Sequence, residues 1–343
     1  MEKQKEILFG KSLKEITDEV VELGMQKFVG KQITHWLYQK QVTSFDRMVN
    51  ISKKNLETLK REFTLGRTAP KSEQEASDGT KKYLFKTITG RYIEAAYIPE
   101  QNRNTLCVSS QMGCKMGCEF CATGQQKFHG QLRAGEIINQ LFSLPEFKSV
   151  TNIVYMGMGE PMDNYEEVKR SLDILTADWG YGISPRRINV STIGVIPTMK
   201  RFIEETDCHL AVSLHSPFDE ERASFMPVQK AYPISEVINL IKKYDWKGQR
   251  RISFEYIVFE GINHSEKHVK ELAKLLNGLR SRINLIRFHE IPGSRFSTTT
   301  DKSIELFKEQ LRQKGIITTI RASRGQDIDA ACGLLSTKKL MEN

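Results

Sequence analysis

The sequence has no long apolar run. Its mean hydropathy is −0.43, and no stretch approaches the ~20 apolar residues that a membrane-spanning helix needs. The first residues, MEKQKEILFGKSLKEI, lack the apolar core of a secretory signal peptide. These absences argue against a membrane or secreted protein. We therefore expect a cytoplasmic one, in which thiols and oxygen-sensitive clusters persist.

The sequence also lacks a second CxxC pair and an HExxH motif, which would point to structural or catalytic zinc. It has six cysteines, and four of them lie in the stretch TLCVSSQMGCKMGCEFCATG. Within it, Cys114, Cys118 and Cys121 form a CxxxCxxC pattern. Three thiolates on one short loop suit a [4Fe–4S] cluster with one iron left open to another ligand. A zinc site with an open position and unrelated buried cysteines are the two alternatives.

The charge balance favours a polyanionic partner. The chain has 51 Lys and Arg against 42 Asp and Glu, a net charge of +9, and its pI is about 9.1. RNA fits this balance because each phosphate that a basic residue neutralises releases counterions. A solvated basic surface without a partner explains the same charge.

A helical unit is predicted over residues 1–66. Its first helix, Ser12–Leu23, opens with the capping-box pattern Ser12-x-x-Glu15. A second helix covers about Gly30–Gln39, and a third begins at Ser52. From the pattern alone, this unit is either a packing appendage or an RNA-docking accessory domain.

Residues 67–104 predict a polar linker followed by a β-hairpin. The strands Tyr83–Ile88 and Arg91–Ile98 flank the turn signal Thr89-Gly90. Glu94 lies in the second strand, where an isolated glutamate is ordinarily a solvated edge residue. The hairpin is expected to be an extension to the main domain.

From residue 105 to about 322, strands alternate with amphipathic helices of roughly 10–15 residues, which implies a parallel sheet with right-handed crossovers. Six such units predict an α/β fold, an incomplete (β/α)6 barrel, whose functional loops follow the carboxyl ends of its strands. The predicted strands are Thr105–Ser109, Asn152–Met156, Arg187–Thr192, His209–Leu214, Arg251–Val258, Asn284–Phe288 and Ile316–Arg321. The predicted helices are Ala134–Leu144, Tyr165–Leu175, Ile196–Glu205, Ile234–Tyr244, Glu266–Leu276 and Lys302–Gln313.

Small and polar residues follow the predicted strands. After the second strand comes Gly157-Met158-Gly159-Glu160-Pro161, where glycines allow a ligand close to the backbone and Glu160 can accept a hydrogen bond from an ammonium group. Ser191 ends the third strand and Ser213-Leu214-His215 the fourth. These groups suit a ribose hydroxyl or a carboxylate, and ordinary strand capping explains them equally well.

The segment 323–343 carries Cys332 in the run DIDAACG. Its small neighbours suggest that the thiol is accessible to another group. Cys208 lacks such a setting and is assigned to packing.

These motifs together resemble the RlmN/Cfr family of radical SAM adenosine methyltransferases, over about residues 27–337. The resemblance is carried by the segments KQITHWLYQK, YIEAAYIPE, TLCVSSQMGCKMGCEFCATG, GMGEP, VSTIGVIP, SLHSP and SRGQDIDAACG. CxxxCxxC alone indicates only the radical SAM superfamily. A cysteine seven residues before this motif, together with a CG near the C-terminus, indicates a much smaller group of proteins within that superfamily.

The resemblance implies a mechanism. Cys332 takes a methyl group from one S-adenosylmethionine (SAM). A second SAM, bound to the cluster of Cys114, Cys118 and Cys121, gives a 5′-deoxyadenosyl radical that abstracts hydrogen from the methylated cysteine. The resulting radical adds to the adenine and crosslinks protein to RNA. Cys107 would resolve the crosslink through a transient disulfide with Cys332. Glu94 aligns with the family's proton acceptor, which revises its first interpretation.

By the same resemblance the SAM site is lined by Gly159, Glu160, Ser191, Ser213, Leu214 and His215. His289, in FHEIPG, stands where many relatives have asparagine in a segment like WNPFPG. Both side chains can donate a hydrogen bond to adenine or ribose.

The resemblance leads us to expect 2-methyladenosine formation in the peptidyl-transferase centre of 23S rRNA, and in tRNA at an adenosine next to the anticodon. Methylation at C8 of the same rRNA adenosine, as in the Cfr branch, uses the same cysteines. A non-catalytic RNA-binding protein with a structural cluster needs none of Cys107, Glu94 and Cys332. We further expect a monomer that is reduced by flavodoxin or ferredoxin.

Overall fold

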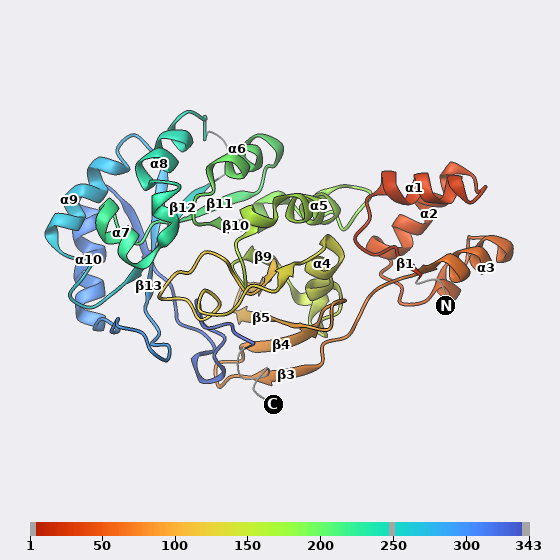
Figure 1. Ribbon diagram of the computed structural model, residues 1–343, viewed down its shortest axis with the longest axis horizontal. Helices are drawn as coiled ribbons and strands as arrows, with labels where there is room; N and C mark the ends of the chain where they lie inside the picture. The colour runs from red at the N-terminus through yellow and green to blue at the C-terminus, as the bar shows by residue number, and fades with distance from the viewer. Residues whose placement is uncertain (1–4, 247–250, 338–343) are drawn as a thin grey trace.

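The computed structural model describes residues 5–246 and 251–337. Its centre is a ten-stranded sheet with the order β14-β13-β12-β11-β10-β9-β6-β5-β4-β3 (Figure 1). In this sheet, β6, β9, β10, β11, β12, β13 and β14 pair in parallel. Their bounds are β6 (Arg103–Cys107), β9 (Asn152–Tyr155), β10 (Ile188–Thr192), β11 (His209–Ser213), β12 (Ile252–Val258), β13 (Ser281–Arg287) and β14 (Ile317–Ile320).

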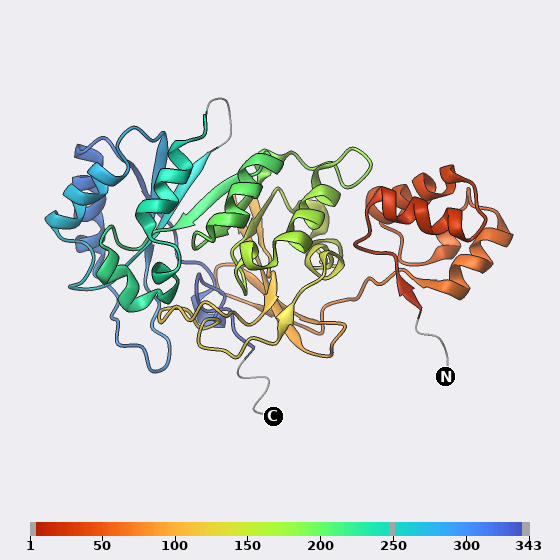
Figure 2. The same cartoon turned by 45° about the horizontal axis from the view of Figure 1, so that its top comes forward.

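Each parallel connection carries at least one helix, and Figure 2 shows these helices along one side of the sheet. The sheet runs from β14 to β3 without closing on itself. The prediction of an incomplete barrel of six β–α units followed by a last strand is therefore confirmed. The helices are α4 (Ala134–Phe142), α5 (Tyr165–Thr176), α6 (Ile196–Glu205), α7 (Asp219–Phe225), α8 (Ile234–Lys242), α9 (Glu266–Leu275) and α10 (Asp301–Gln313).

The predicted hairpin is part of the main sheet. Its strands β4 (Lys81–Lys86) and β5 (Tyr92–Glu100) are antiparallel, and β5 pairs with β6. The polar linker predicted before it contains a strand that was not predicted, β3 (Ser72–Glu75), which pairs with β4. All four residues of β3 are exposed, so it has no apolar alternation that sequence could reveal. Backbone hydrogen bonding to the edge of β4 forms this strand.

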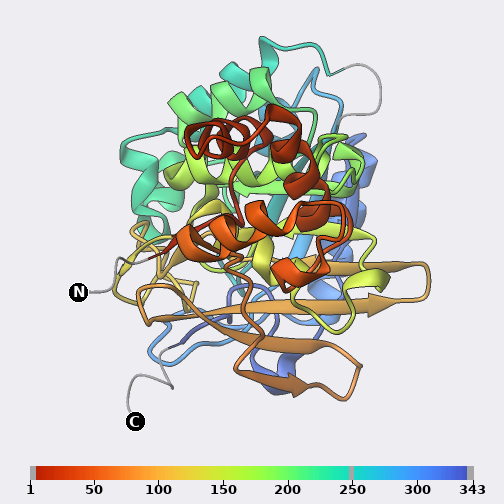
Figure 3. The same cartoon turned by 90° about the vertical axis from the view of Figure 1, so that its right-hand side faces the viewer.

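The N-terminal helices form a unit beside the barrel in Figure 1, and in Figure 3 this unit faces the viewer. It packs onto the barrel, because the Phe9 ring lies 5.4 Å from that of Phe142 in α4. Helix α1 (Leu13–Glu22) has the predicted capping box, with Glu15 N–H donating to Ser12 Oγ and Ser12 N–H donating to Glu15 Oε2. Helix α2 (Lys27–Thr34) continues into a π-helical turn, and α3 is Lys53–Glu62. A short parallel pair, β1 (Glu6–Ile7) with β2 (Phe63–Thr64), joins the ends of this unit.

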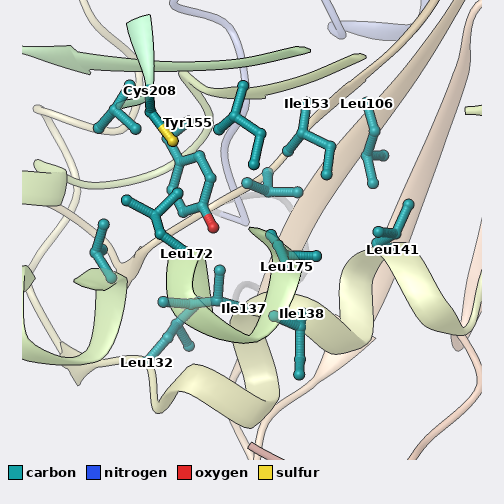
Figure 4. Packing of buried hydrophobic residues seen from close by; sticks show 14 of the residues in the cluster. Leu106, Leu132, Ile137, Ile138, Leu141, Ile153, Tyr155, Leu172, Leu175 and Cys208 are labelled. Carbon is teal, nitrogen blue, oxygen red and sulfur yellow. The ribbon is translucent and has the colours of Figure 1, made fainter. Parts of the chain in front are cut away.

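The main core lies between the sheet and its helices. Figure 4 shows Ile137 and Leu141 of α4 and Leu172 of α5 packed beneath Ile153 of β9, with Tyr155 and Cys208 alongside. All seven residues of β12 are buried, as expected of a parallel strand near the middle of a sheet. Cys208 belongs to this core, as predicted. Within the described ranges, no helix is long and apolar enough to cross a membrane.

Candidate active site

The CxxxCxxC loop leaves the carboxyl end of β6 and is tied at its base by the antiparallel pair β7 (Gln111–Met112) and β8 (Gly130–Gln131). Inside the loop, Cys121 N–H donates to the carbonyl of Cys118 at 3.2 Å. Gly124 closes the bend, because a Cβ there would lie 2.8 Å from the Cys118 carbonyl oxygen. The chain therefore returns tightly around the three thiols.

These three thiols influence one another. Burial raises the pKa of Cys114 to about 12 and that of Cys118 well above its ordinary range, and the neighbouring thiols add to both shifts. A bound metal opposes this rise in pKa, since cysteine thiols lose their protons when they bind metal. Among residues 5–246 and 251–337, no three Cys, His, Asp or Glu side chains converge as ligands of one ion. The thiolates of a [4Fe–4S] cluster each bind a different iron, so the sulfur-only set of one loop fits that group.

The turn after β9 packs directly against the base of the cysteine loop. Gly159 has φ +100°, and a Cβ there would lie 2.5 Å from Gln111 Cβ, so only glycine fits. The next residue, Glu160, donates its N–H to Gln111 Oε1 at 2.8 Å. The glycine turn and the cysteine loop are thereby fixed to each other.

The Glu160 carboxylate is fully buried and already bonded. Oε1 accepts from Thr192 Oγ1 at 2.6 Å and from Met162 N–H at 3.1 Å, and Oε2 accepts from Ile193 N–H at 3.0 Å. Burial nevertheless raises the pKa of Glu160 to about 7. A carboxylate has about four acceptor positions, so one remains for an ammonium donor.

A buried arginine links the ends of β10 and β11. Arg222, on α7, donates to the carbonyls of Leu214, Ser213 and Ile193 at 2.9–3.1 Å. His215 follows with φ +57°, and its Nδ1 accepts from Ile257 N–H at 2.9 Å. Burial, helped by Arg222, lowers the pKa of His215 to about 3, so the ring is neutral. Ser191 and Ser213 remain half-buried at the strand ends.

One cavity of about 590 Å³ runs through the barrel. At the carboxyl ends of the strands it is lined by Cys107, Cys121, Gly157, His289 and Cys332. The structure thus brings Cys332 to Cys107, although 224 residues lie between them in the chain. The other expected SAM-site residues are outside the cavity lining. They are Gly159, Glu160, Ser191, Ser213, Leu214 and His215.

The two cysteines differ in exposure. Cys332 is exposed, whereas Cys107 is buried, and burial together with Cys332 raises the pKa of Cys107 to about 12. Two hydrogen bonds hold the Cys332 segment against the cysteine loop: Ala122 N–H donates to the Gly333 carbonyl at 2.8 Å, and the Thr123 hydroxyl donates to the Leu335 carbonyl at 2.7 Å. In Figure 1 the same segment runs beside β3 and β4.

Arg321 provides positive charge beside these cysteines, and the sequence motifs did not indicate it. It follows β14 and lies 3.3 Å from Glu255, which Asn284 also bonds at 2.8 Å. Cys332, Glu255 and Cys107 all raise the pKa of Arg321, with Cys332 the largest cause. The guanidinium is therefore a fixed cation at the cysteine pair.

Glu94 is not a solvated edge residue; it is buried, with 4% of its surface exposed. In β5 it is two residues from Ala96, which pairs with Cys107, so Glu94 and Ala96 share a face. Its Oε2 accepts from Ser336 N–H at 2.8 Å, four residues after Cys332. Burial raises the pKa of Glu94. The carboxylate therefore lies under the segment that carries Cys332.

The opposite mouth of the cavity, at the amino ends of the strands, is lined by arginines. They come from the beginnings of β6, β10, β12 and β13, so the parallel register collects them at one edge. Within the described part of the chain these side chains form no ion pair, and Glu100 is the nearby acid, acting on Arg103. We call this set the arginine mouth: Arg103, Arg186, Arg187, Arg251 and Arg282.

Comparison with known proteins agrees with this geometry. Residues 108–276 match the radical SAM superfamily, and residues 7–65 match the ribosomal RNA large subunit methyltransferase N-terminal domain. The chain is 53% identical over 336 residues to a probable dual-specificity RNA methyltransferase RlmN of Bacteroides thetaiotaomicron, covering 98% of this chain and 97% of that protein. It is 41% identical to the dual-specificity RNA methyltransferase RlmN of Halorhodospira halophila, covering 91% and 88%.

A solved structure is also similar over nearly the whole chain. It is a radical SAM methyltransferase from Sphaerobacter thermophilus, with a TM-score of 0.90 and 38% identity, covering 96% of this chain and 99% of that one. The similarity therefore includes both the N-terminal helical unit and the barrel.

Proposed function

The chain belongs to the RlmN family of dual-specificity RNA methyltransferases, within the radical SAM superfamily, and we propose that it forms 2-methyladenosine in RNA. The substrates we propose are the peptidyl-transferase centre of 23S rRNA and the adenosine next to the anticodon of tRNA. One observation carries the proposal. A single cavity leads from the arginine mouth to Cys107 and Cys332, beside the cysteine loop. In such a cavity, the RNA backbone would bind at the arginine mouth and the adenine would lie at the end that holds Cys107 and Cys332.

The cofactors fit the residues at the carboxyl ends of the strands. Cys114, Cys118 and Cys121 would hold one [4Fe–4S] cluster, and Glu160 with the ends of β10 and β11 would hold SAM. When bound, SAM would supply the methyl group, and SAM together with the cluster would remove a hydrogen atom from that methyl group. We propose that two SAM molecules are used per turnover.

Cys332 carries the methyl carbon on its sulfur in this proposal. After losing a hydrogen atom, that carbon bonds to C2 of the adenine, and the adduct gives up one electron to a one-electron carrier. Cys107 then attacks the Cys332 sulfur: the S–S bond forms, the C–S bond breaks, and its electron pair goes to the carbon, which takes up a proton. A cellular dithiol reduces the disulfide. The shared cavity and the nearby Arg321 guanidinium support this pairing.

Glu94 accepts the proton that leaves C2. Its burial under the Cys332 segment supports this role, because burial raises the pKa of the carboxyl and makes it a better proton acceptor. His289 lines the cavity that holds Cys107 and Cys332, and it offers a ring nitrogen to adenine or ribose.

The arginine mouth supports RNA as the substrate. Arginine side chains without ion-pair partners suit phosphate oxygens, which they bind bidentately. We also propose residues 1–66 as an RNA-docking domain, 67–104 as the linker and hairpin, 105–322 as the catalytic barrel and 323–343 as the segment that carries Cys332. Of that last segment, residues 338–343 lie outside the described residues. A cytoplasmic monomer reduced by flavodoxin or ferredoxin completes the proposal.

Identification of the product tests the function. The protein is reconstituted anaerobically with iron and sulfide, then given SAM, a reductant and either an rRNA fragment or tRNA. We expect mass spectrometry of the digested RNA to find 2-methyladenosine in both substrates. Finding only 8-methyladenosine would assign the chain the C8 reaction of the Cfr branch, and finding no methylated adenosine would contradict the proposal.

A further inference from the structure

Glu94 faces a lysine on the neighbouring strand. Lys82 Nζ lies 3.3 Å from Glu94 Oε1, and the two side chains are only 11% and 6% exposed. Lys82 is on β4, where it pairs with Ala96, so it reaches Glu94 diagonally across the β4–β5 ladder. Such a buried ion pair contrasts with the exposed pairs elsewhere on these strands.

The remaining groups around Glu94 come from three other segments. Ser336 N–H donates to Oε2, and Ser109 Oγ donates to the Glu94 backbone carbonyl at 2.6 Å. The Glu94 N–H points to Met158 Sδ at 3.4 Å. Asp329 is the other charged group that acts on the carboxyl, and its charge opposes ionisation. Of these groups around the Glu94 carboxyl, Lys82 is therefore the one that carries positive charge.

The neighbouring Lys81 shows what an ordinary lysine does on this strand. Its Nζ binds Glu146 at 2.9 Å and Glu73 at 3.0 Å on the opposite face of β4. It is 23% exposed and has no contact with Glu94. Lys81 is thus a matched control one residue away.

We propose that Lys82 is a positioning residue for Glu94, holding the carboxylate ionised and oriented under the Cys332 segment so that it can accept the C2 proton. This inference rests on the proposed function of Glu94. When the C2–H bond breaks, its electron pair stays with the base and the proton goes to a Glu94 oxygen. A carboxyl that is already protonated cannot take it.

The physical reason is the cost of a buried charge. An isolated carboxylate in an apolar setting takes up a proton rather than remain charged, and an opposite charge within about 4–6 Å reverses that tendency. Burial raises the pKa of Glu94, whereas Lys82 lowers it by both charge and hydrogen bonding. Removing Lys82 therefore leaves Glu94 protonated over a wider pH range.

The test measures how fast the protein–RNA adduct is resolved as a function of pH. Lys82→Met is compared with wild type, Lys81→Met, Lys82→Arg and Glu94→Gln in the reconstituted enzyme. We expect Lys82→Met to shift the acidic limb of the rate profile upward by about 1–3 pH units, with the rate recovered at high pH. Lys82→Arg should keep the wild-type limb, and so should Lys81→Met. If Lys82→Met does not fold, Lys82→Gln replaces it.

Two outcomes separate the claims. If Glu94→Gln resolves the adduct at the wild-type rate, the proposed role of Glu94 fails. If Glu94→Gln is slow but the Lys82 variant keeps the wild-type acidic limb, or is slow equally at every pH, the role of Lys82 alone is overturned.

A second readout needs no turnover. Difference infrared spectra against Glu94→Gln follow the protonated carboxyl stretch of Glu94 during a pH titration. We expect this band to persist to higher pH in Lys82→Met than in wild type. Identical titrations in the two proteins would overturn the inference.

Discussion

The two mouths of the barrel cavity are built on different principles. At the carboxyl ends of the strands the polar groups are buried and bonded to one another, as Glu160 is to Thr192 and Arg222 to three carbonyls. At the amino ends the arginines are held by no ion pair within the described ranges. A bonded, buried network fixes geometry for chemistry, whereas unpaired exposed charge attracts a partner and adapts to it. The difference supports the proposal that the cofactors bind at one end and the RNA backbone at the other.

The largest effect is expected at the cysteine pair in the carboxyl-end mouth of the cavity. Cys332→Ala should abolish methylation and form no protein–RNA adduct, because the methyl carrier is missing. Cys107→Ala should accumulate the adduct, because nothing attacks the Cys332 sulfur. Denaturing gels with labelled RNA distinguish the two, and Cys208→Ala, in the core, is the control. Equal adduct levels in both variants would show that the cysteines do not have separate roles.

Arg222→Met should remove the bonds that fix the carboxyl-end mouth. The guanidinium is fully buried, so its loss removes the donor to the carbonyls of Ile193 and Ser213, whereas the Leu214 carbonyl still accepts from Ser216 N–H. We expect the free energy of unfolding to fall by about 3–5 kcal/mol, measured by urea denaturation. Arg201→Met is the control, because that arginine pairs with surface glutamates in water and its loss should change the unfolding free energy far less. Equal losses of unfolding free energy in the two variants would show that the buried Arg222 and the solvated Arg201 contribute alike.

Glu160 should make the stability of the cofactor-free protein depend on pH. Its pKa of about 7 in the folded protein exceeds the ordinary value of 4.5, so its stabilising contribution is full below pH 4.5 and is lost as the pH rises through 7. The unfolding free energy of wild type relative to Glu160→Gln should therefore fall by about 2–3 kcal/mol from pH 5 to pH 8. A difference that stays constant with pH would show that Glu160 is ionised in the folded protein throughout.

The arginine mouth should affect binding and leave stability alone. Replacing Arg186 and Arg187 by glutamine should weaken RNA binding about tenfold and lower the salt dependence of the binding constant by about one to two units. Arg312→Gln, on the far helix α10, is the control. Unfolding should change by less than about 0.5 kcal/mol in both. If the mouth variant binds RNA normally at every salt concentration, the RNA backbone enters elsewhere.

Much of the framework could be predicted from local sequence signals. The capping box at Ser12 predicts α1, and strands spaced by amphipathic helices predict the partial barrel. The cluster loop is readable because its three cysteines are close together in the chain. The family resemblance, and not the strand pattern, drew attention to Glu94 and linked Cys332 to Cys107.

The sequence by itself determined most helices and strands of the barrel and indicated a cluster at the cysteine loop, because helix periodicity and ligand spacing are local properties of the chain. Only the tertiary structure decided which distant groups meet. It buried Glu94 beside Lys82, placed Arg321 at the cysteine pair, and gathered five arginines from four strands at one edge. Those contacts depend on sheet register, which decides which side chains are neighbours, and on burial, which changes their pKa values. Neither leaves a local pattern in the sequence.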